Sequence, residues 1–129
     1  MSFGNEPPDV LADAVEKLLA KIDETDLAAF YERELPAMPR DVVQSFVEAI
    51  FTAFRERGES SEDAAEESGT TLEAIERGER GAVGALLAYA RTNADLIKEA
   101  TILLVERRPD SIGALPAFVR DGLAARHGV

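Results

Sequence analysis

The sequence predicts an all-α protein, folded as a compact multi-helix bundle. Every long periodic segment repeats its apolar residues at helical spacing, and no segment alternates apolar and polar residues for long enough to indicate a strand. Prolines and glycines stand between the periodic segments, where they end one helix before the next begins. The chain of 129 residues is long enough for one domain, which we place at residues 9–129.

Two helices are predicted over residues 9–35, after a flexible tail at residues 1–8. The tail is polar and contains one glycine and two prolines. The first helix, from Asp9 to near Asp23, carries one wide apolar stripe. The stripe consists of Val10, Leu11, Ala14, Val15, Leu18, Leu19 and Ile22. Thr25 can cap the second helix, and we expect the two helices to form an N-terminal helical hairpin.

A third helix is predicted from Pro39 to about Arg57, at the start of a core that spans residues 39–107. Pro36 and Pro39 separate it from the preceding helix, because proline lacks the N–H donor that a continuous helix needs. Gly58 is expected to end it. The helix holds three of the six phenylalanines of the chain, so we expect it to lie in the hydrophobic core.

Two short helices are predicted next, separated by Gly69, and they form a helix-turn-helix-like pair at residues 60–78. Ser60 can cap the first helix through its hydroxyl oxygen. Gly69 can adopt the left-handed conformation that a sharp helix end requires. Thr70 and Glu73 have the spacing of a capping box at the start of the second helix.

Three more helices are predicted in the C-terminal half: Ala82–Arg91, Ala94–Arg107 and a C-terminal helix at residues 116–127. Asn93 is expected to cap the second of these, and Pro116 opens the third. The apolar residues of Ala94–Arg107 cover more than one face of the helix. This helix is therefore predicted either to lie at the centre of the fold or to form half of a dimer seam.

The stretch from Arg55 to Arg80 carries three residues at characteristic intervals. Ala65 lies in the first short helix, Gly69 follows four residues later in the turn, and Ile75 lies six residues further on. This pattern resembles the Cro and phage-repressor type of helix-turn-helix, in which a small residue, a glycine and a branched apolar residue stand at these intervals. The ending IERGER and the predicted order of five helices over the core are also similar to that family.

The resemblance implies a non-catalytic transcriptional regulator that binds double-stranded DNA. Its candidate DNA-binding residues are Thr70, Thr71, Arg77 and Arg80. It also implies a homodimer, with residues 94–107 or residues 10–22 at the seam. The sequence departs from the family at Glu59, Ser68 and Thr70. The family usually has apolar residues at these positions, which pack the two helices together.

The chain is strongly acidic, with 25 acidic and 14 basic residues and a formal net charge of −11. Residues 55–80 alone carry a net charge of −5, whereas residues 81–129 carry +1. An acidic surface repels DNA phosphates at low salt. The same composition is common in proteins from a salt-rich cytoplasm, where the Debye length falls to about 3 Å at molar salt and screens this repulsion. We therefore expect adaptation to high salt.

A second interpretation of the stretch from Arg55 to Arg80 needs no DNA. Glu73 and Arg77 are spaced for an ion pair within a helix, and Glu76 and Arg80 have the same spacing. The acidic helices would then face solvent or a basic partner. In this case the chain is a helical protein–protein interaction or dimerisation module without DNA binding, and the sequence leaves both interpretations open.

The sequence offers no motif for catalysis. The chain has no cysteine and its one histidine is His127, so neither a zinc site nor a Cys/His catalytic site can be assembled. The run GERGAVGALL lacks the lysine of a phosphate-binding loop. Its glycines, Gly78, Gly81 and Gly84, are expected to end one helix and to allow close approach at the next.

The sequence also offers no motif for a membrane anchor. The longest apolar run, Ile102–Val105, is far too short to span a membrane. We predict a cytoplasmic protein without enzyme activity, cofactor, metal, membrane partner or small-molecule substrate.

Overall fold

The computed structural model describes the backbone of residues 8–126 and the side chains of residues 10–123 other than Ile112 and Phe118. This part of the chain is all-helical and contains no strand, as predicted. Its α-helices are α1 (Pro8–Leu19), α2 (Glu24–Glu34), α3 (Arg40–Glu56), α4 (Ser61–Glu67), α5 (Leu72–Glu76), α6 (Arg80–Ala90), α7 (Leu96–Arg107) and α8 (Ala117–Arg126). Two 3-10 helices, η2 (Leu35–Ala37) and η3 (Pro109–Ala114), follow α2 and α7.

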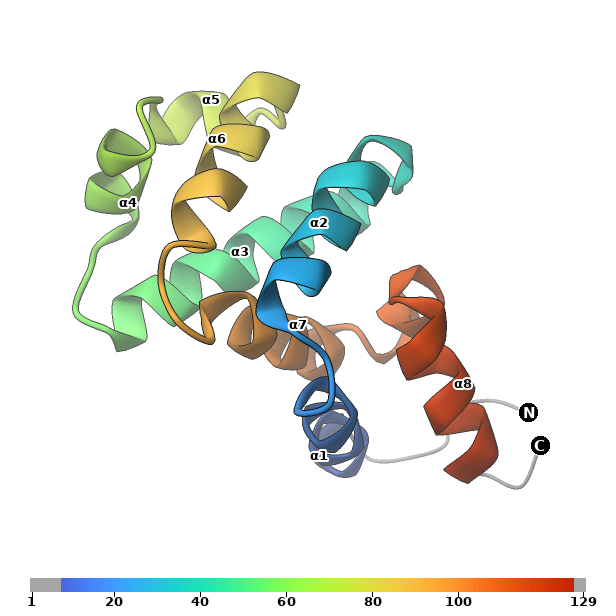
Figure 1. Cartoon of the computed structure of the whole chain (residues 1–129). Coiled ribbons are helices and arrows are strands. Elements are labelled where there is room, and N and C mark those ends of the chain that lie inside the picture. The colour runs from blue at the N-terminus through green and yellow to red at the C-terminus, as the bar shows by residue number, and fades with distance from the viewer. Residues whose placement is uncertain (1–7, 127–129) are drawn as a thin grey trace.

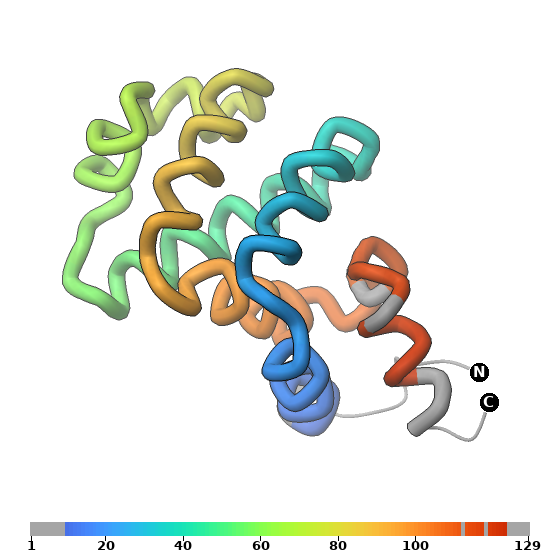
Figure 2. Tube along the Cα trace, viewed as in Figure 1, coloured from blue at the N-terminus to red at the C-terminus, as the bar shows by residue number. Residues whose placement is uncertain are grey.

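The helix α7 lies at the centre of the molecule. It packs mainly against α3 and α1, and Figures 1 and 2 show α4, α5 and α6 at one end of the bundle and α1 and α8 at the other. The α7 side chains of Leu96, Ile97, Leu104 and Val105 are each at most 1% exposed. Of the two positions predicted for this helix, the central one is confirmed.

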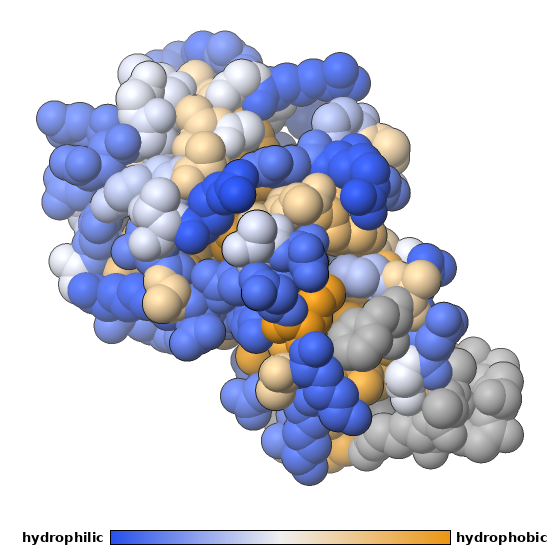
Figure 3. Space-filling model, in the orientation of Figure 1, coloured by the Kyte–Doolittle hydropathy of each residue, from blue (hydrophilic) through white to orange (hydrophobic). Residues whose placement is uncertain are grey.

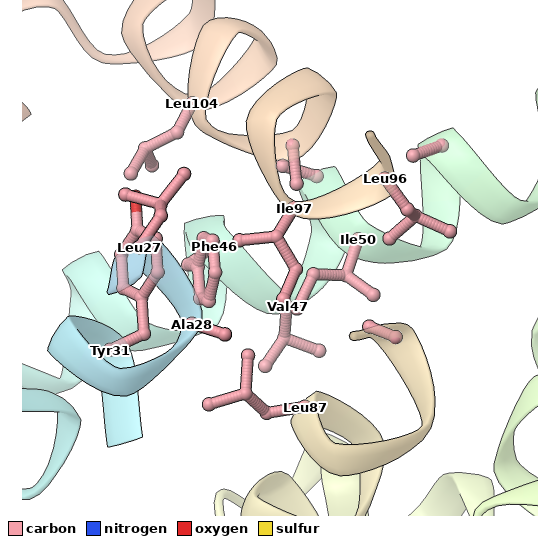
Figure 4. Close-up of a cluster of buried hydrophobic side chains, with 14 of the residues drawn as sticks. Leu27, Ala28, Tyr31, Phe46, Val47, Ile50, Leu87, Leu96, Ile97 and Leu104 are labelled. Carbon is pink, nitrogen blue, oxygen red and sulfur yellow. The ribbon is translucent and has the colours of Figure 1, made fainter. Parts of the chain in front are cut away.

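Figure 4 shows the part of the hydrophobic core that lies between α2, α3, α6 and α7, and buried residues of α1, α4, α5 and α8 belong to the same core. Tyr31 of α2 stacks on Phe46 of α3, with ring centroids 4.1 Å apart. At the other end of α3, Phe54 stacks on Tyr89 of α6 at 5.2 Å. Phe46, Phe51 and Phe54 are all buried, so the prediction that this helix lies in the core is confirmed.

The expected helical hairpin over residues 9–35 is wrong. The main contacts of α1 are with α7 and α8, and those of α2 are with α7 and α6, rather than with each other. The two apolar faces are therefore buried mainly against α7, within one core, and not against each other. The cap of α2 is also different from the prediction: the Asp23 carboxylate accepts a hydrogen bond from the Thr25 backbone N–H at 2.8 Å, so Asp23 is the cap.

The start of α7 differs from the prediction as well. Asp95, not Asn93, occupies the capping position, in a left-handed conformation with φ of +64°. The Asn93 side-chain amide instead donates to the backbone carbonyl of Tyr89 at 3.2 Å. Asn93 therefore completes the end of α6, and the next helix begins at Leu96, two residues later than expected.

The two chain ends lie only partly within the described residues. The helix α1 already includes Pro8, which was predicted to belong to the tail, and residues 1–7 lie outside the described part. The helix α8 confirms the C-terminal helix, although His127 lies outside the described residues. It packs on α1, where Gly122 lies against Leu18.

Candidate functional site

The pair α4 and α5 is a helix, a glycine turn and a second helix. Ser60 accepts a hydrogen bond from the Asp63 N–H at 3.1 Å and caps α4, as predicted. Gly69 has φ of +82°, a conformation that residues with a Cβ rarely adopt. Its N–H donates to the Glu66 carbonyl, and the N–H of Thr70 donates to the Ala65 carbonyl. This double hydrogen bond is the Schellman ending of a helix.

The predicted capping box at Thr70 and Glu73 is wrong by one residue. Because the Thr70 N–H completes the end of α4, the next helix begins later, and Thr71 is its cap. The Thr71 hydroxyl accepts a hydrogen bond from the Ala74 N–H at 3.1 Å. The helix α5 that follows, Leu72–Glu76, has only 5 residues.

Ala65 and Ile75 are both buried, with exposed fractions of 1% and 2%, and both belong to the same hydrophobic core. The turn at Gly69 thus places both helices of the pair against the rest of the domain. Two of the polar residues that stand where the family has apolar ones form hydrogen bonds. The Ser68 hydroxyl donates to the Ala64 carbonyl at 2.7 Å, and Glu59 accepts a hydrogen bond from the Tyr89 hydroxyl at 2.9 Å.

The four predicted DNA-binding residues do not form one free surface. The Thr71 hydroxyl is used as a cap, and Thr70 is half-buried at the end of α4. The Arg77 guanidinium is held between Glu73 and Glu79. Hydrogen bonds to Glu79, together with the charges of Glu79 and Glu73, raise the pKa of Arg77. Its positive charge is therefore already compensated within the chain.

The expected ion pair between Glu76 and Arg80 does not form. Arg80 is the first residue of α6 and no longer belongs to the same helix as Glu76, because Gly78 ends α5 with φ of +75°. Among the described residues Arg80 forms no ion pair. Its side chain lies instead at the edge of a pocket.

This pocket, called here the α2–α6 pocket, has a volume of about 350 Å³ and is bounded by α2, η2, the start of α3 and α6. Figure 3 shows hydrophobic residues on the face between α2 and α6, bordered by hydrophilic ones. The apolar part of its lining comes from Leu35, Met38, Val43, Val83 and Leu87. A size in the range of about 300–1,000 Å³ with a mostly apolar lining is typical of sites that bind small molecules.

Three arginines line the same pocket: Arg40, Arg77 and Arg80. The Arg40 guanidinium donates to the backbone carbonyl of Arg77 at 3.3 Å, which ties the start of α3 to the end of α5. The one acidic residue in the lining, Glu32, forms an ion pair with Arg91 at 2.7 Å. The pocket therefore combines an apolar lining with positive charge, although the chain as a whole is acidic.

Gly84 of α6 also lines the pocket. A Cβ built at Gly84 meets no atom within 4 Å, and the same is true of Gly81. The expectation that these glycines allow close helix packing is therefore wrong; close approach occurs at Gly122, where an added Cβ lies 2.6 Å from a Leu18 methyl carbon. The absence of a side chain at Gly84 keeps the pocket open.

Sequence analysis missed the α2–α6 pocket. Its lining comes from segments at residues 32–44 and 77–87, which are distant in the sequence. The one local signal is Gly84. A glycine inside a helix lowers stability by about 0.5–1 kcal/mol relative to alanine, so its presence there indicates a role other than helix formation.

Another hollow, beside α4, has an acidic lining. It is lined by Glu59, Asp63, Glu66 and Glu67, among others. One oxygen of Glu59 is buried there without a hydrogen-bond partner. In the described part of the chain, no group of three or more His, Asp or Glu residues is arranged to hold a metal ion.

Comparisons with protein-family models, with curated proteins and with solved structures found no match to this chain. The likeness to Cro and phage repressors stays a prediction from the residues between Arg55 and Arg80. Among the described residues, no helix has both the length and the apolar character needed to cross a membrane.

Proposed function

We propose that this protein is a non-catalytic binding protein and that the α2–α6 pocket is its contact site. The observation that carries this proposal is an open, mostly apolar pocket lined by three arginines in a chain with a net charge of −11. A concave, mostly apolar pocket with a few polar groups in its lining is the usual form of a ligand-binding site. This proposal differs from both interpretations of the sequence, DNA binding and protein–protein interaction, because it depends on a pocket that the sequence did not predict.

The proposal is tested with N-phenyl-1-naphthylamine, a neutral dye whose fluorescence rises in an apolar site. Gly84→Leu should fill the pocket from a position where an added Cβ meets nothing within 4 Å. Gly81→Leu is the matched control, because Gly81 lies on the same helix, is equally open and does not line the pocket. We expect the wild type and Gly81→Leu to bind the dye at one saturable site and Gly84→Leu to lose it. Equal binding by both variants, or no binding by the wild type, would contradict the proposal.

A second proposal is a DNA-binding regulator adapted to high salt. One observation favours it: Gly69 has a positive φ between two short helices, and Ala65 and Ile75, at the intervals of the Cro type, are both buried. The acidic surface weighs against it at low salt, since neutralising phosphates contributes much of the affinity of DNA-binding proteins. In molar salt this disadvantage is small for an acidic chain.

DNA retention separates the two proposals. If the second is right, the chain is retained on mixed-sequence duplex DNA at molar KCl, and Arg77→Ala and Arg80→Ala both reduce retention. Arg33→Ala on α2 removes the same charge away from the helix pair and should have no effect. Absence of retention at both low and molar KCl would eliminate DNA binding and leave the first proposal untouched.

The homodimer through residues 94–107 or 10–22 also stays a proposal. The apolar side chains of α7 are mostly covered by α1 and α3, and Val10, at 39% exposed, is the one large hydrophobic side chain that is clearly exposed among the described residues. A sedimentation mass of two chains at high micromolar concentration would support the dimer, and the mass of one chain would eliminate it.

A further inference from the structure

We propose that the α2–α6 pocket binds a small amphiphilic carboxylate, an apolar chain or ring that carries one carboxylate group. This inference rests on the proposed function and adds the chemical class of the ligand. The apolar body would lie against Leu35, Val83 and Leu87, and the carboxylate would lie at the guanidinium groups of Arg40 and Arg80.

The dimensions of the pocket favour a small ligand over a helix of a partner protein. A docking helix inserts several apolar side chains along one face, spaced over two turns or more, and needs an elongated groove to receive them. A volume of about 350 Å³ lies near the lower end of the range for small-molecule sites and is suited to a single compact apolar group. The lining by Leu35, Met38 and Val43 supplies this group with an apolar environment.

The charges around the pocket favour an anion. Arg40 and Arg80 are the first residues of α3 and α6, and neither forms an ion pair among the described residues. Arg77 also lines the pocket but is already paired with Glu73 and Glu79. One N–H of Arg40 is used by the Arg77 carbonyl, so its other N–H donors and the guanidinium of Arg80 remain for a ligand, while the chain as a whole would repel anions.

Arginine is well suited to a carboxylate, because its planar fork of N–H donors matches the two oxygens. A neutral ligand of the same shape would gain only the apolar contacts, and a cationic one would meet Arg40 and Arg80 unfavourably. The affinity of the pocket for a ligand should therefore depend more strongly on the charge of the head group than on the detailed shape of the apolar body.

Three probes with the same chain test the inference: octanoate, 1-octanol and octylamine. Their affinities are measured by displacement of N-phenyl-1-naphthylamine and by amide chemical-shift changes in the full-length protein at one KCl concentration. We expect octanoate to bind at least about tenfold more tightly than 1-octanol, and octylamine to bind most weakly, because a hydrogen bond to a charged group is worth about 1.5–3 kcal/mol.

Four variants locate the site. Arg40→Gln and Arg80→Gln should each weaken octanoate binding by about five- to tenfold and change 1-octanol binding by less than about twofold. Arg55→Gln is the matched control, because it removes the same charge from the other end of α3, outside the pocket. Gly84→Leu should exclude both probes. Unchanged 1-octanol binding by the arginine variants shows that the pocket itself is intact.

The outcomes distinguish this inference from the proposed function. If octanoate and 1-octanol bind equally and Gly84→Leu excludes both, the inference of a carboxylate ligand is wrong, and the proposal of a binding pocket is retained. The same conclusion follows if octylamine binds best, or if Arg55→Gln weakens octanoate as much as Arg80→Gln does. If neither the dye nor any probe binds the wild type, both the inference and the proposed function are wrong.

Discussion

A single buried hydrogen bond joins the helices α2 and α7. The hydroxyls of Tyr31 and Thr101 lie 2.7 Å apart, and Thr101 donates its own hydrogen to the Ile97 carbonyl at 2.9 Å, so Tyr31 must be the donor of the pair. Burial raises the pKa of Tyr31 well above its ordinary value, which keeps the hydroxyl protonated. Among the described residues, this is the one hydrogen bond between side chains of the two helices, and its loss should be measurable.

Thr101→Val should destabilise the protein by about 1–3 kcal/mol, because it leaves the buried Tyr31 hydroxyl without an acceptor. Tyr31→Phe should cost less, about 0.5–1.5 kcal/mol, since Thr101 keeps its bond to Ile97. The double variant should cost less than the sum of the two, as expected for partners in contact. Urea unfolding measures all three, and strictly additive losses would show that the two hydroxyls do not interact.

Glu24, at the start of α2, contributes to the pH dependence of stability. Burial, followed by the nearby charge of Asp95, raises the pKa of Glu24 above 4.5, and one of its carboxylate oxygens is buried without a partner. The pKa of Glu24 is thus higher in the folded than in the unfolded chain. The contribution of Glu24 to stability is therefore complete at a pH below its unfolded-state pKa, and it is lost as the pH rises through its folded-state pKa.

Glu24→Gln should therefore flatten the decrease in unfolding free energy that occurs as the pH rises above the ordinary pKa of a glutamate. Glu16→Gln is the control, because it removes one carboxylate from an exposed position on α1. Denaturant titrations at several pH values measure the slope. The assignment to Glu24 is wrong if its variant keeps the slope of the wild type, or if Glu16→Gln flattens the slope equally.

At the scale of the elements, two glycines inside helices have opposite surroundings. Gly84 of α6 faces the open pocket, whereas Gly122 of α8 faces Leu18 of α1 at a distance that an added Cβ could not occupy without movement. Only at Gly122 does the glycine allow two helices to pack closely. The same substitution at the two positions should therefore have different effects.

Gly84→Ala should stabilise the protein by about 0.5–1 kcal/mol, the difference between glycine and alanine in a helix. Gly122→Ala should give no such gain, because the Leu18 side chain must move to accommodate the new methyl group. Thermal unfolding of both variants makes the comparison. An equal rise in Tm for the two would show that the α1–α8 contact adapts freely.

Three successive helix ends of the core follow one local rule. The helices α3, α4 and α5 all end at a glycine with positive φ, and in each case the N–H of the following residue reaches back to a carbonyl five residues earlier. The three glycines are Gly58, Gly69 and Gly78. This repeated ending is why the order of the helices, and most of their boundaries to within one or two residues, could be predicted without tertiary information.

For the whole molecule, the net charge of −11 should make stability depend on salt. Raising KCl from about 0.1 M to about 1 M shortens the Debye length from about 10 Å to about 3 Å and screens repulsion between the acidic side chains. We expect Tm to rise by at least about 4 °C, equivalent to roughly 1 kcal/mol for a domain of this size.

A charge variant separates screening from other effects of salt. The double substitution Glu62→Gln and Glu66→Gln removes two exposed carboxylates from α4. If repulsion is the cause, this variant should have a higher Tm at low salt and a smaller rise with KCl. An identical rise in the variant and the wild type would mean that KCl acts through hydration and not through charge.

The amino-acid sequence alone determined the all-α class, the order of the helices, the cap at Ser60 and the glycine ends, because these depend on periodicity and on hydrogen bonds within a few residues. Even there, Thr71 and Asp95 replaced the expected caps, since the end of one helix sets where the next can begin.

Only the tertiary structure decided that α7 is central, that α1 and α2 both pack on α7 and not mainly on each other, and that Arg40 and Arg80 line one pocket. These features depend on contacts between segments tens of residues apart. No local pattern encodes such contacts, because each one forms only when the apolar face of a helix packs against a helix that is distant in the sequence.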